Sequence, residues 1–275
     1  MFWLHRLNPA NKFKEYFELA QAISPEMKDE VYRLRHRVYC EELGFERASP
    51  DGREHDEFDE QSRHLLLRSV KTGASVGCVR LVMVPPEGPR LLLPFEKIFA
   101  ATIDRRTFDP AALPRSSVAE ISRLTLACEF RRRRRIEVSG EAAHWAFGTP
   151  AHPTYPYVQL GLYLGAIALA ELLGIATLFL ITEPRLLAHF RRLGFRVRQI
   201  GEPVEHRGLR VLSVAEVGNP VVQLPFFMRP LYRVIAREID EGRRSAPRQS
   251  GEVPHRARMT GQIGPGHAGA RPPFH

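Results

Sequence analysis

The stretch YVQLGLYLGAIALAELLGIATLFLI, from Tyr157 to Ile181, decides the fold class of this chain. It is long enough to span a bilayer and carries a single charge, Glu171. Two features favour a different structure: Gly174 stands where a helix would end, and the segment TLFLIT, residues 177–182, is apolar and partly β-branched like a buried strand. The stretch therefore predicts an apolar helix, a turn and a buried strand, with a membrane span as the weaker alternative.

Helix and strand patterns continue on both sides of this stretch. A helix begins at Pro184 and ends at Gly194, and another begins at Ser24-Pro25, an N-cap followed by proline, and ends at Gly44. Strands in mixed orientation with helices on both faces predict a three-layer α/β domain with a central mixed sheet. The other expected elements are a hairpin of residues 64–70 and 75–84, a short helix around 95–99, and strands over 118–127, 195–200 and 209–217.

The 275 residues favour one domain with extensions. We expect an N-terminal extension over residues 1–23, the domain over 24–240, and a disordered basic tail over 241–275, where Gly, Pro, Ser and Arg dominate. No internal repeat is evident.

The net charge of +9 indicates an acidic partner such as nucleic acid, an anionic membrane or an acidic protein. Residues 243–275 contribute six arginines against one acid, Glu252, and a second concentration runs from Arg131 to Arg135. Three widely spaced cysteines and no evident secretory signal predict a cytoplasmic protein. The tail and residues 224–228 leave open an association with the inner face of the membrane.

Metal and thiol chemistry find little support. His144 and His152 lie eight apart without acidic or cysteine neighbours, so we expect no metal. Cys128 has no histidine beside it in the sequence, which favours a structural thiol over an acylated nucleophile. The sequence therefore favours neither a metal site nor a cysteine nucleophile.

One arginine is expected to be buried on the pattern of its helix alone. Arg35 lies four residues after Val31 and three before Val38, which places its guanidinium on the apolar stripe. A buried cation of this kind needs a partner carboxylate.

Four segments, YRLRHRVYCEELGF, HDEFD, CVRL and EISR, follow one another in the order and spacing of the acyl-homoserine-lactone synthases. The resemblance covers Val31 to Val217 and implies a GNAT-like three-layer α/β/α fold whose central sheet carries a bulged strand. Within that group the chain looks most similar to the long-chain N-acyl amino acid synthases and to the acyltransferases associated with PEP-CTERM/exosortase systems.

The resemblance also implies roles for individual residues. Tyr39 and Phe45 stand where the family has phenylalanine and tryptophan. These replacements preserve the aromatic surface but leave the identity of the acyl acceptor undetermined. Glu120 and Arg123 form the E-x-x-R pair expected at the catalytic centre. The residues expected to bind substrate are Arg35, Tyr39, Phe45, Asp56, Asp59, Arg80 and Ser122.

The chemistry fits these residue types. An α-amino group with a pKa of about 7.7 to 8.0 is mostly protonated at neutral pH, so its acylation needs a base, for which Glu120 is the best candidate. The oxyanion of the thioester carbonyl can be stabilised by backbone N–H groups at a splayed strand edge. Because residues three apart in a regular strand face opposite ways, Glu120 and Arg123 share a pocket only if a β-bulge intervenes. The alternative is that the charged residues form a buried ion-pair network that ties the N-terminal loop to the sheet.

The donor is predicted from the segment CEFRRRRRIEV, which replaces the glycine-containing loop that holds coenzyme A in this superfamily. A cationic strip of Arg131, Arg132, Arg133, Arg134 and Arg135 favours docking of the acidic acyl carrier protein, and a solvated basic loop is the alternative. No cofactor is expected to be bound, since the acyl-phosphopantetheine thioester is a substrate.

The acyl chain is expected to lie along the apolar helix of residues 157–173. Gly161 and Gly165, four residues apart, would leave a groove on one helix face, and a buried methylene in it contributes about 0.8 kcal/mol. Ordinary protein, namely Phe226, Phe227 and the last helix, could cover that face instead.

The resemblance therefore implies an N-acyltransferase that moves a long-chain fatty acyl group from acyl carrier protein to the amino group of a small amine, with an amino acid as the favoured acceptor. An acyl-homoserine-lactone synthase using S-adenosylmethionine is the alternative enzyme. A basic membrane-surface or nucleic-acid-binding protein is the non-enzymatic alternative, although no nucleic-acid-binding motif is present.

Overall fold

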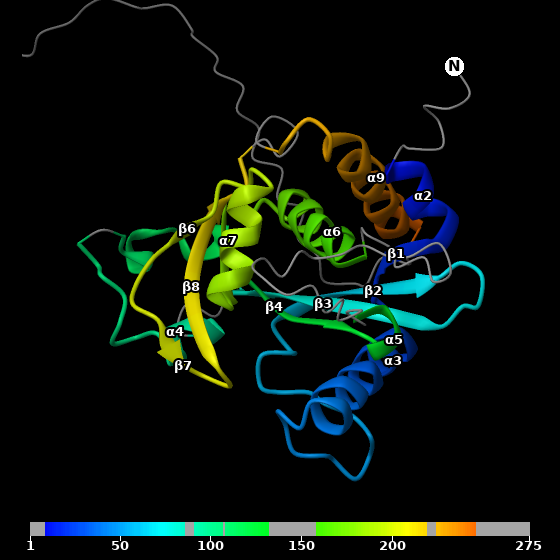
Figure 1. Cartoon of the computed structure of the whole chain (residues 1–275), viewed down its shortest axis with the longest axis horizontal. Helices are drawn as coiled ribbons and strands as arrows, with labels where there is room; N and C mark the ends of the chain where they lie inside the picture. The colour runs from blue at the N-terminus through cyan, green and yellow to red at the C-terminus, as the bar shows by residue number, and fades with distance from the viewer. Residues whose placement is uncertain (1–8, 86–90, 107, 132–157, 219–223, 246–275) are drawn as a thin grey trace, which may run out of the picture. The chain divides into compact units, whose positions relative to one another are not determined.

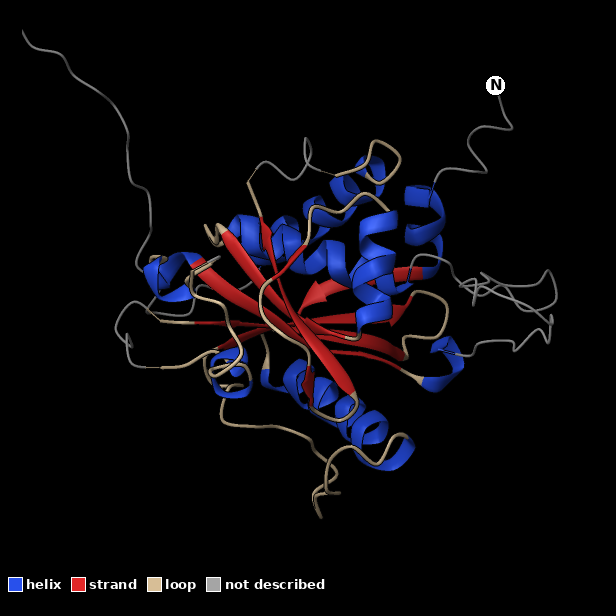
Figure 2. Cartoon of the chain, turned by 60° about the vertical axis from the view of Figure 1, so that its left-hand side comes forward, coloured by secondary structure: helices blue, strands red, loops and turns tan. Residues whose placement is uncertain are grey.

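The computed structural model describes residues 9–85, 91–106, 108–131, 158–218 and 224–245. These residues form three layers, in which a twisted sheet lies between two groups of helices (Figures 1 and 2). The predicted α/β/α architecture is confirmed. The tail of residues 246–275, expected to be disordered, lies outside the described residues.

The sheet has eight strands and follows the order β1-β2-β3-β4-β5-β8-β6, with β7 also paired to β8. Among the strands that the structure describes, β4 and β5 run parallel and every other neighbouring pair is antiparallel. The strands are β1 (Phe17–Gln21), β2 (Ser62–Ser69), β3 (Ser75–Met83), β4 (Val118–Leu126), β5 (Thr177–Thr182), β6 (Arg198–Gln199), β7 (Val204–Glu205) and β8 (Leu209–Glu216).

Alternate side chains of each strand enter the cores on opposite faces of the sheet. Leu65 and Leu67 join the larger core beneath α6, α7 and α9, whereas Leu66 between them packs toward α3. A third cluster forms around Phe95 and Phe99 near α4. The helices are α2 (Pro9–Tyr16), α3 (Pro25–His36), α4 (Pro94–Ile98), α5 (Cys128–Arg131), α6 (Val158–Leu172), α7 (Pro184–Arg192) and α9 (Arg229–Ser245), and short 3₁₀ turns span Pro110–Ala112 and Arg115–Ser117.

The decisive stretch has the predicted structure, since α6 is followed by the turn at Gly174 and by β5. Gly174 has φ +73°, a conformation that favours glycine at the end of a helix. Among the described residues, no helix is both long and apolar enough to cross a membrane.

The helix expected from Ser24 to Gly44 is present but changes character. The Ser24 side chain accepts a hydrogen bond from the amide of Met27, and Pro25 occupies the first turn as predicted. After His36 the helix widens into a π-helix over Arg37–Glu42, a form that often marks functional sites. The spacing of apolar residues in this segment did not predict the π-helix.

Two terminal segments differ from the expected boundaries. Residues 17–21, expected in an extension, form edge strand β1 and pair with β2, while α2 packs Phe13 into the larger core. At the other end, α9 continues through residue 245. The sheet and its helices therefore begin before residue 24 and continue past residue 240.

Candidate active site

A β-bulge in β4 opens the centre of the sheet. Cys78 and Arg80 of β3 pair with Thr125 and Ser122 of β4, so two steps on one strand face three on the other. Arg123 within this interval has φ +50°, unusual for a residue with a side chain. The predicted bulge is confirmed, and Arg123 itself lies in it.

The strands β4 and β5 part where the bulge begins. Their parallel pairing ends at Ile121 and Leu180, although both strands continue. A cavity of about 380 Å³ opens there, and the residues from both strand ends line it. The predicted site residues that it brings together are Tyr39, Phe45, Arg80, Glu120, Ser122 and Arg123.

Glu120 reaches the cavity from a nearly dry environment. Its side chain is 1% exposed, and one carboxylate oxygen accepts a hydrogen bond of 2.7 Å from the amide of Phe95. Burial raises the pKa of Glu120 to about 8, against the opposing effects of this hydrogen bond and of Arg80 and Arg123. No ion pair to Glu120 occurs in the described part of the chain. A carboxyl group in this state can take up a proton near neutral pH.

Arg80, which lines the cavity, and Arg35, which does not, belong to one network of buried ion pairs. Arg35 donates to Glu54 at 2.5 Å and to Asp59 at 2.6 and 3.1 Å, which confirms the expected partner carboxylate. Arg80 donates to Asp56 at 2.5 Å and to Asp59 at 2.9 Å. Arg35, Asp56 and Asp59 do not line the cavity at Glu120.

The two aspartates of this network have low pKa values. Burial alone would raise the pKa of Asp59, but hydrogen bonds and charge from Arg35, together with Arg80, outweigh it and hold the pKa well below its ordinary value. The pKa of Asp56 is lowered in the same way by Arg80 and Arg123. His64 beside Asp59 has its pKa lowered to about 3, mainly by burial, and stays neutral.

Arg123 connects the bulge to the loop that follows α3. Its guanidinium donates to Glu54 at 3.1 Å, to Asp56 at 3.0 Å and to Glu46 at 3.1 Å. It also lies over the ring of Tyr39, 5.5 Å from the centroid. Arg123 thus lines the cavity while its charge is neutralised by three carboxylates. The catalytic role implied for it stays a prediction.

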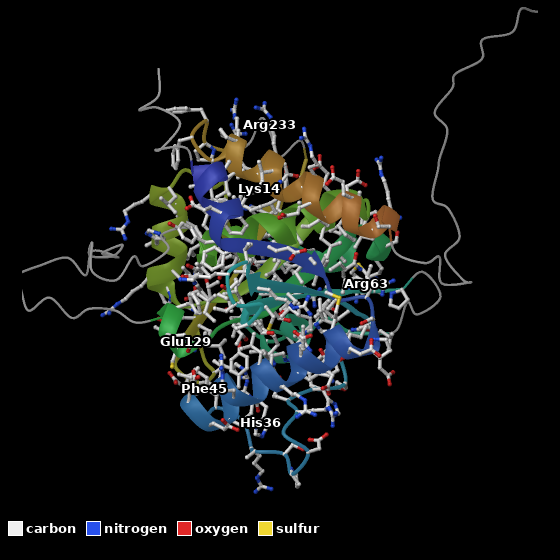
Figure 3. All side chains as sticks on the ribbon, turned by 90° about the vertical axis from the view of Figure 1, so that its right-hand side faces the viewer. Lys14, His36, Phe45, Arg63, Glu129 and Arg233 are labelled. Atoms are coloured by element: carbon white, nitrogen blue, oxygen red, sulfur yellow. The ribbon has the colours of Figure 1, made fainter. Side chains whose placement is uncertain are left out.

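The other expected substrate contacts surround this arginine. The Tyr39 hydroxyl donates to the carbonyl of Leu124 at 3.2 Å, which fixes the aromatic ring against the bulge. Ser122 accepts a hydrogen bond of 3.0 Å from Arg80. Phe45 is 40% exposed at the rim of the cavity, below Glu129 in Figure 3. Its exposure leaves an aromatic surface available to a substrate.

Several residues of the site had not been predicted. Glu54 and Glu46 complete the ion pairs, while His206, Arg207 and Arg210 enter the cavity from the β7–β8 hairpin. Arg207 pairs with Glu46 at 2.6 Å, so it connects this hairpin to the loop after α3. A strand was predicted over 209–217, but nothing in the sequence indicated that its first residues and the turn before it would reach the cavity.

The expected acyl groove at Gly161 and Gly165 was wrong in its position. A Cβ atom at Gly161 would lie 2.3 Å from Cε2 of Phe13, and one at Gly165 would lie 2.4 Å from Cδ2 of Leu19. These glycines allow α2 and β1 to pack closely against α6, and neither lines the cavity at Glu120. The groove is filled by ordinary protein, although by the N-terminal elements instead of Phe226 and Phe227.

The predicted docking strip falls largely beyond what the structure describes. Arg131 ends α5, and Arg132, Arg133, Arg134 and Arg135 lie outside the described residues, as do His144 and His152. The part of the chain that is described holds no cluster of side chains suited to a metal ion.

Comparisons with known proteins agree with this geometry. Residues 34–140 match the family model described as an acetyltransferase (GNAT) domain. A comparison with curated proteins finds no match.

Solved structures share the fold at low sequence identity. The structure of TofI in a ternary complex with an inhibitor and MTA is 21% identical, covers 78% of this chain and 96% of TofI, and has a TM-score of 0.52. BjaI, described as a CoA-dependent acyl-homoserine lactone synthase and solved with MTA, is 20% identical, covers 81% of this chain and 89% of its own, and has a TM-score of 0.52. FeeM, an N-acyl amino acid synthase from uncultured soil microbes, is 15% identical over 77% of this chain and 97% of its own, with a TM-score of 0.49 that is too low to argue from.

The domain match and the fold indicate the class of the protein. Residues 34–140 match a GNAT acetyltransferase domain and the chain shares the fold of TofI and BjaI, which supports the predicted N-acyltransferase. The finer resemblance to acyltransferases of PEP-CTERM/exosortase systems stays a prediction, as does the cytoplasmic location.

Proposed function

We propose that this protein transfers a long-chain fatty acyl group from acyl carrier protein to the amino group of an amino acid. The observation that carries the proposal is Glu120, a buried carboxyl group without an ion-pair partner in the described chain, in the cavity at the bulged strand. Its pKa of about 8 lies beside the α-amino pKa of about 7.7 to 8.0, so proton transfer between the two groups is nearly balanced.

The reaction needs one proton acceptor. Glu120 in its carboxylate form removes a proton from the bound ammonium group, directly or through a water, and the neutral nitrogen attacks the thioester carbonyl. The C–N bond forms and the C–S bond breaks. The nitrogen loses its second proton, which protonates the departing thiolate of the phosphopantetheine, and the proton held by Glu120 is released to solvent. In this proposal, backbone amides beyond the last paired residues of β4 and β5 stabilise the oxyanion.

Residues of the β7–β8 hairpin support an amino acid as the acceptor. Arg207 and Arg210 line the same cavity as Glu120; Arg207 is exposed and Arg210 is partly buried. An amino acid carries a carboxylate two bonds from its amine, and a guanidinium binds carboxylates with paired hydrogen bonds. The two arginines, which also pair with Glu46 and Glu183, bring positive charge to the cavity that would receive this carboxylate.

Both donor features are consistent with an acyl carrier protein. Apolar side chains on the other wall of the cavity, Leu124, Tyr163, Leu180 and Leu186, offer a surface to the acyl group. The arginines at 131–135 start at the last residue of α5, shortly after β4 in the sequence, and would attract an acidic carrier.

The direct test is product analysis. The purified full chain is incubated with palmitoyl carrier protein and a mixture of the common amino acids, with S-adenosylmethionine in a parallel reaction, and products are identified by mass spectrometry. An N-acyl amino acid supports the proposal, and the Glu120→Gln variant should form much less of it. An acyl-homoserine lactone from the parallel reaction, or a preference for palmitoyl-coenzyme A, contradicts it.

A further inference from the structure

Phe226 and Phe227 form an exposed aromatic pair ahead of α9. Phe226 is 80% exposed, the highest value for a large apolar side chain among the described residues, and Phe227 is 46% exposed. Their rings lie edge to face with centroids 5.8 Å apart. Leu224 and Met228 on either side are buried, so the segment that carries the two exposed rings is packed into the protein at both ends. Exposure of this kind has a cost in free energy and does not serve packing.

The end of α7 lies against this segment. A Cβ atom at Gly194 would be 3.0 Å from Cγ of Pro225, which brings the basic end of α7 beside the aromatic pair. Residues 184–201 contain five arginines and no acidic residue, and residues 224–237 contain three arginines and no acidic residue. The surroundings of the two phenylalanines are therefore cationic.

The arginines of α9 follow the helical repeat. Arg229, Arg233 and Arg237 are four residues apart and so share one side of the helix. Figure 3 shows Arg233 extending outward, on the same edge of the protein as Lys14. The side chains of Arg233 and Arg237 are exposed, as are those of Arg191 and Arg192 on α7.

Arginines on α3 and β2 have carboxylate partners of a kind that, among the described residues, the arginines of this surface lack. Arg33 on α3 pairs with Asp29 at 2.7 Å, and Arg68 on β2 pairs with Glu30 at 2.7 Å. Within the described ranges no carboxylate pairs with Arg191, Arg192, Arg233 or Arg237. An uncompensated cationic field around exposed rings indicates a partner that is both anionic and apolar.

We propose that Phe226, Phe227, Arg191, Arg192, Arg233 and Arg237, the Phe–Arg surface, bind an anionic lipid membrane. The two rings enter the interface between headgroups and acyl chains, and the arginines pair with lipid phosphates. A nucleic acid would match the charge, but rings at 86° to each other offer no continuous stacking platform. The inference does not depend on the proposed reaction.

The test measures binding of the full chain to lipid vesicles by sedimentation. Vesicles of phosphatidylcholine alone should leave the protein in solution, and vesicles with 30% phosphatidylglycerol should bind it at low salt. The Phe226→Ser/Phe227→Ser variant should bind anionic vesicles about tenfold or more weakly, because it loses the buried ring area. The Arg191→Gln/Arg192→Gln variant should lose about fivefold per arginine and become less sensitive to salt.

The control is Leu91→Ser/Leu92→Ser beside α4, which removes an apolar pair of 46% and 45% exposure and should bind as the wild type does. Thermal melting verifies that all variants fold, and the tail is unchanged in each. The proposal is overturned if the wild type ignores anionic vesicles, if the phenylalanine variant binds them normally, or if the leucine control weakens equally. It is also overturned if the phenylalanine variant keeps vesicle binding and loses only affinity for an acidic carrier protein.

Discussion

Asp59 and Glu120 are both buried carboxyl groups, yet their pKa values move in opposite directions. Asp59 lies between Arg35 and Arg80 and is held in its charged form. Glu120 receives one backbone hydrogen bond, and burial raises its pKa to about 8. Ion pairs hold Asp59 in its charged form. Glu120 has no ion pair in the described part of the chain, so it can bind and release a proton. The ion-pair network holds the loop after α3, and the cavity beside it contains the carboxyl group that we propose as the base.

The substitution Glu120→Gln should have the largest effect, because it removes the titratable carboxyl group from the cavity. Glutamine keeps the size of the side chain and can accept the hydrogen bond from the Phe95 amide, but it cannot take up the proton. We expect turnover to fall by roughly 10²- to 10⁴-fold, the usual contribution of a positioned acid or base. Steady-state assays with acyl carrier protein measure this, and an unchanged rate would remove Glu120 from the reaction.

A second test removes the charge that fixes Asp59. Arg35→Met leaves Glu54 and Asp59 buried without their shared partner, and breaking a buried pair in this way costs about 3–5 kcal/mol. We expect the free energy of unfolding in urea to drop by that amount. Arg33→Met is the matched control, because its pair with Asp29 is exposed to solvent and should contribute little to stability. Equal losses in both variants would show that the network does not hold the loop.

The opposite pKa shifts also predict opposite pH dependences of stability. Because the pKa of Glu120 is raised from 4.5 to about 8, the folded state binds more protons than the unfolded state within that window, and stability falls as pH rises through it. Glu120→Gln lacks this term and should gain up to about 1.4 kcal/mol on the wild type per pH unit between pH 5 and 8.

Asp59 behaves in the reverse sense. Its lowered pKa contributes stability above its unfolded value of 3.8, and that contribution is lost as pH falls below it. Urea unfolding of the wild type and of Glu120→Gln at several pH values separates the two effects. Parallel curves for the two proteins between pH 5 and 8 would show that Glu120 titrates normally.

The smallest effect on activity is expected for substitutions on α6, because one of its faces lines the cavity and the other is packed against protein. Tyr163 faces the cavity, whereas Gly165 is closed by Leu19. Gly165→Ala should cost about 1–3 kcal/mol through overpacking and should leave the preference for acyl chain length unchanged. Tyr163→Ala should alter that preference, although loss of this buried ring, which packs against Phe190, should also cost about 3–5 kcal/mol of stability. Competition assays with acyl carrier proteins of different chain length check both, and a shift by Gly165→Ala alone would return the acyl pocket to the glycine face.

Most helices and strands could be predicted from the sequence because their signals are local. Proline and serine at the start of α3, Gly174 after α6 and the apolar run of β5 each set φ angles or a side-chain period within a few residues. The edge strand β1 escaped prediction, since its five residues carry no turn signal and their pairing with β2 crosses some forty intervening residues.

The sequence by itself determined that Arg35 would be buried on a helix, that it would need a carboxylate partner, and that Glu120 and Arg123 could share a pocket only through a bulge. These follow from helical and strand periodicity and from the cost of burying a charge. Only the tertiary structure decided that Glu54 and Glu46 complete the network, that the β7–β8 hairpin supplies Arg207, and that Phe13 and Leu19 fill the glycine face of α6. Each of these depends on which segments meet across the folded chain, and that is set by the packing of whole elements and leaves no mark on local spacing.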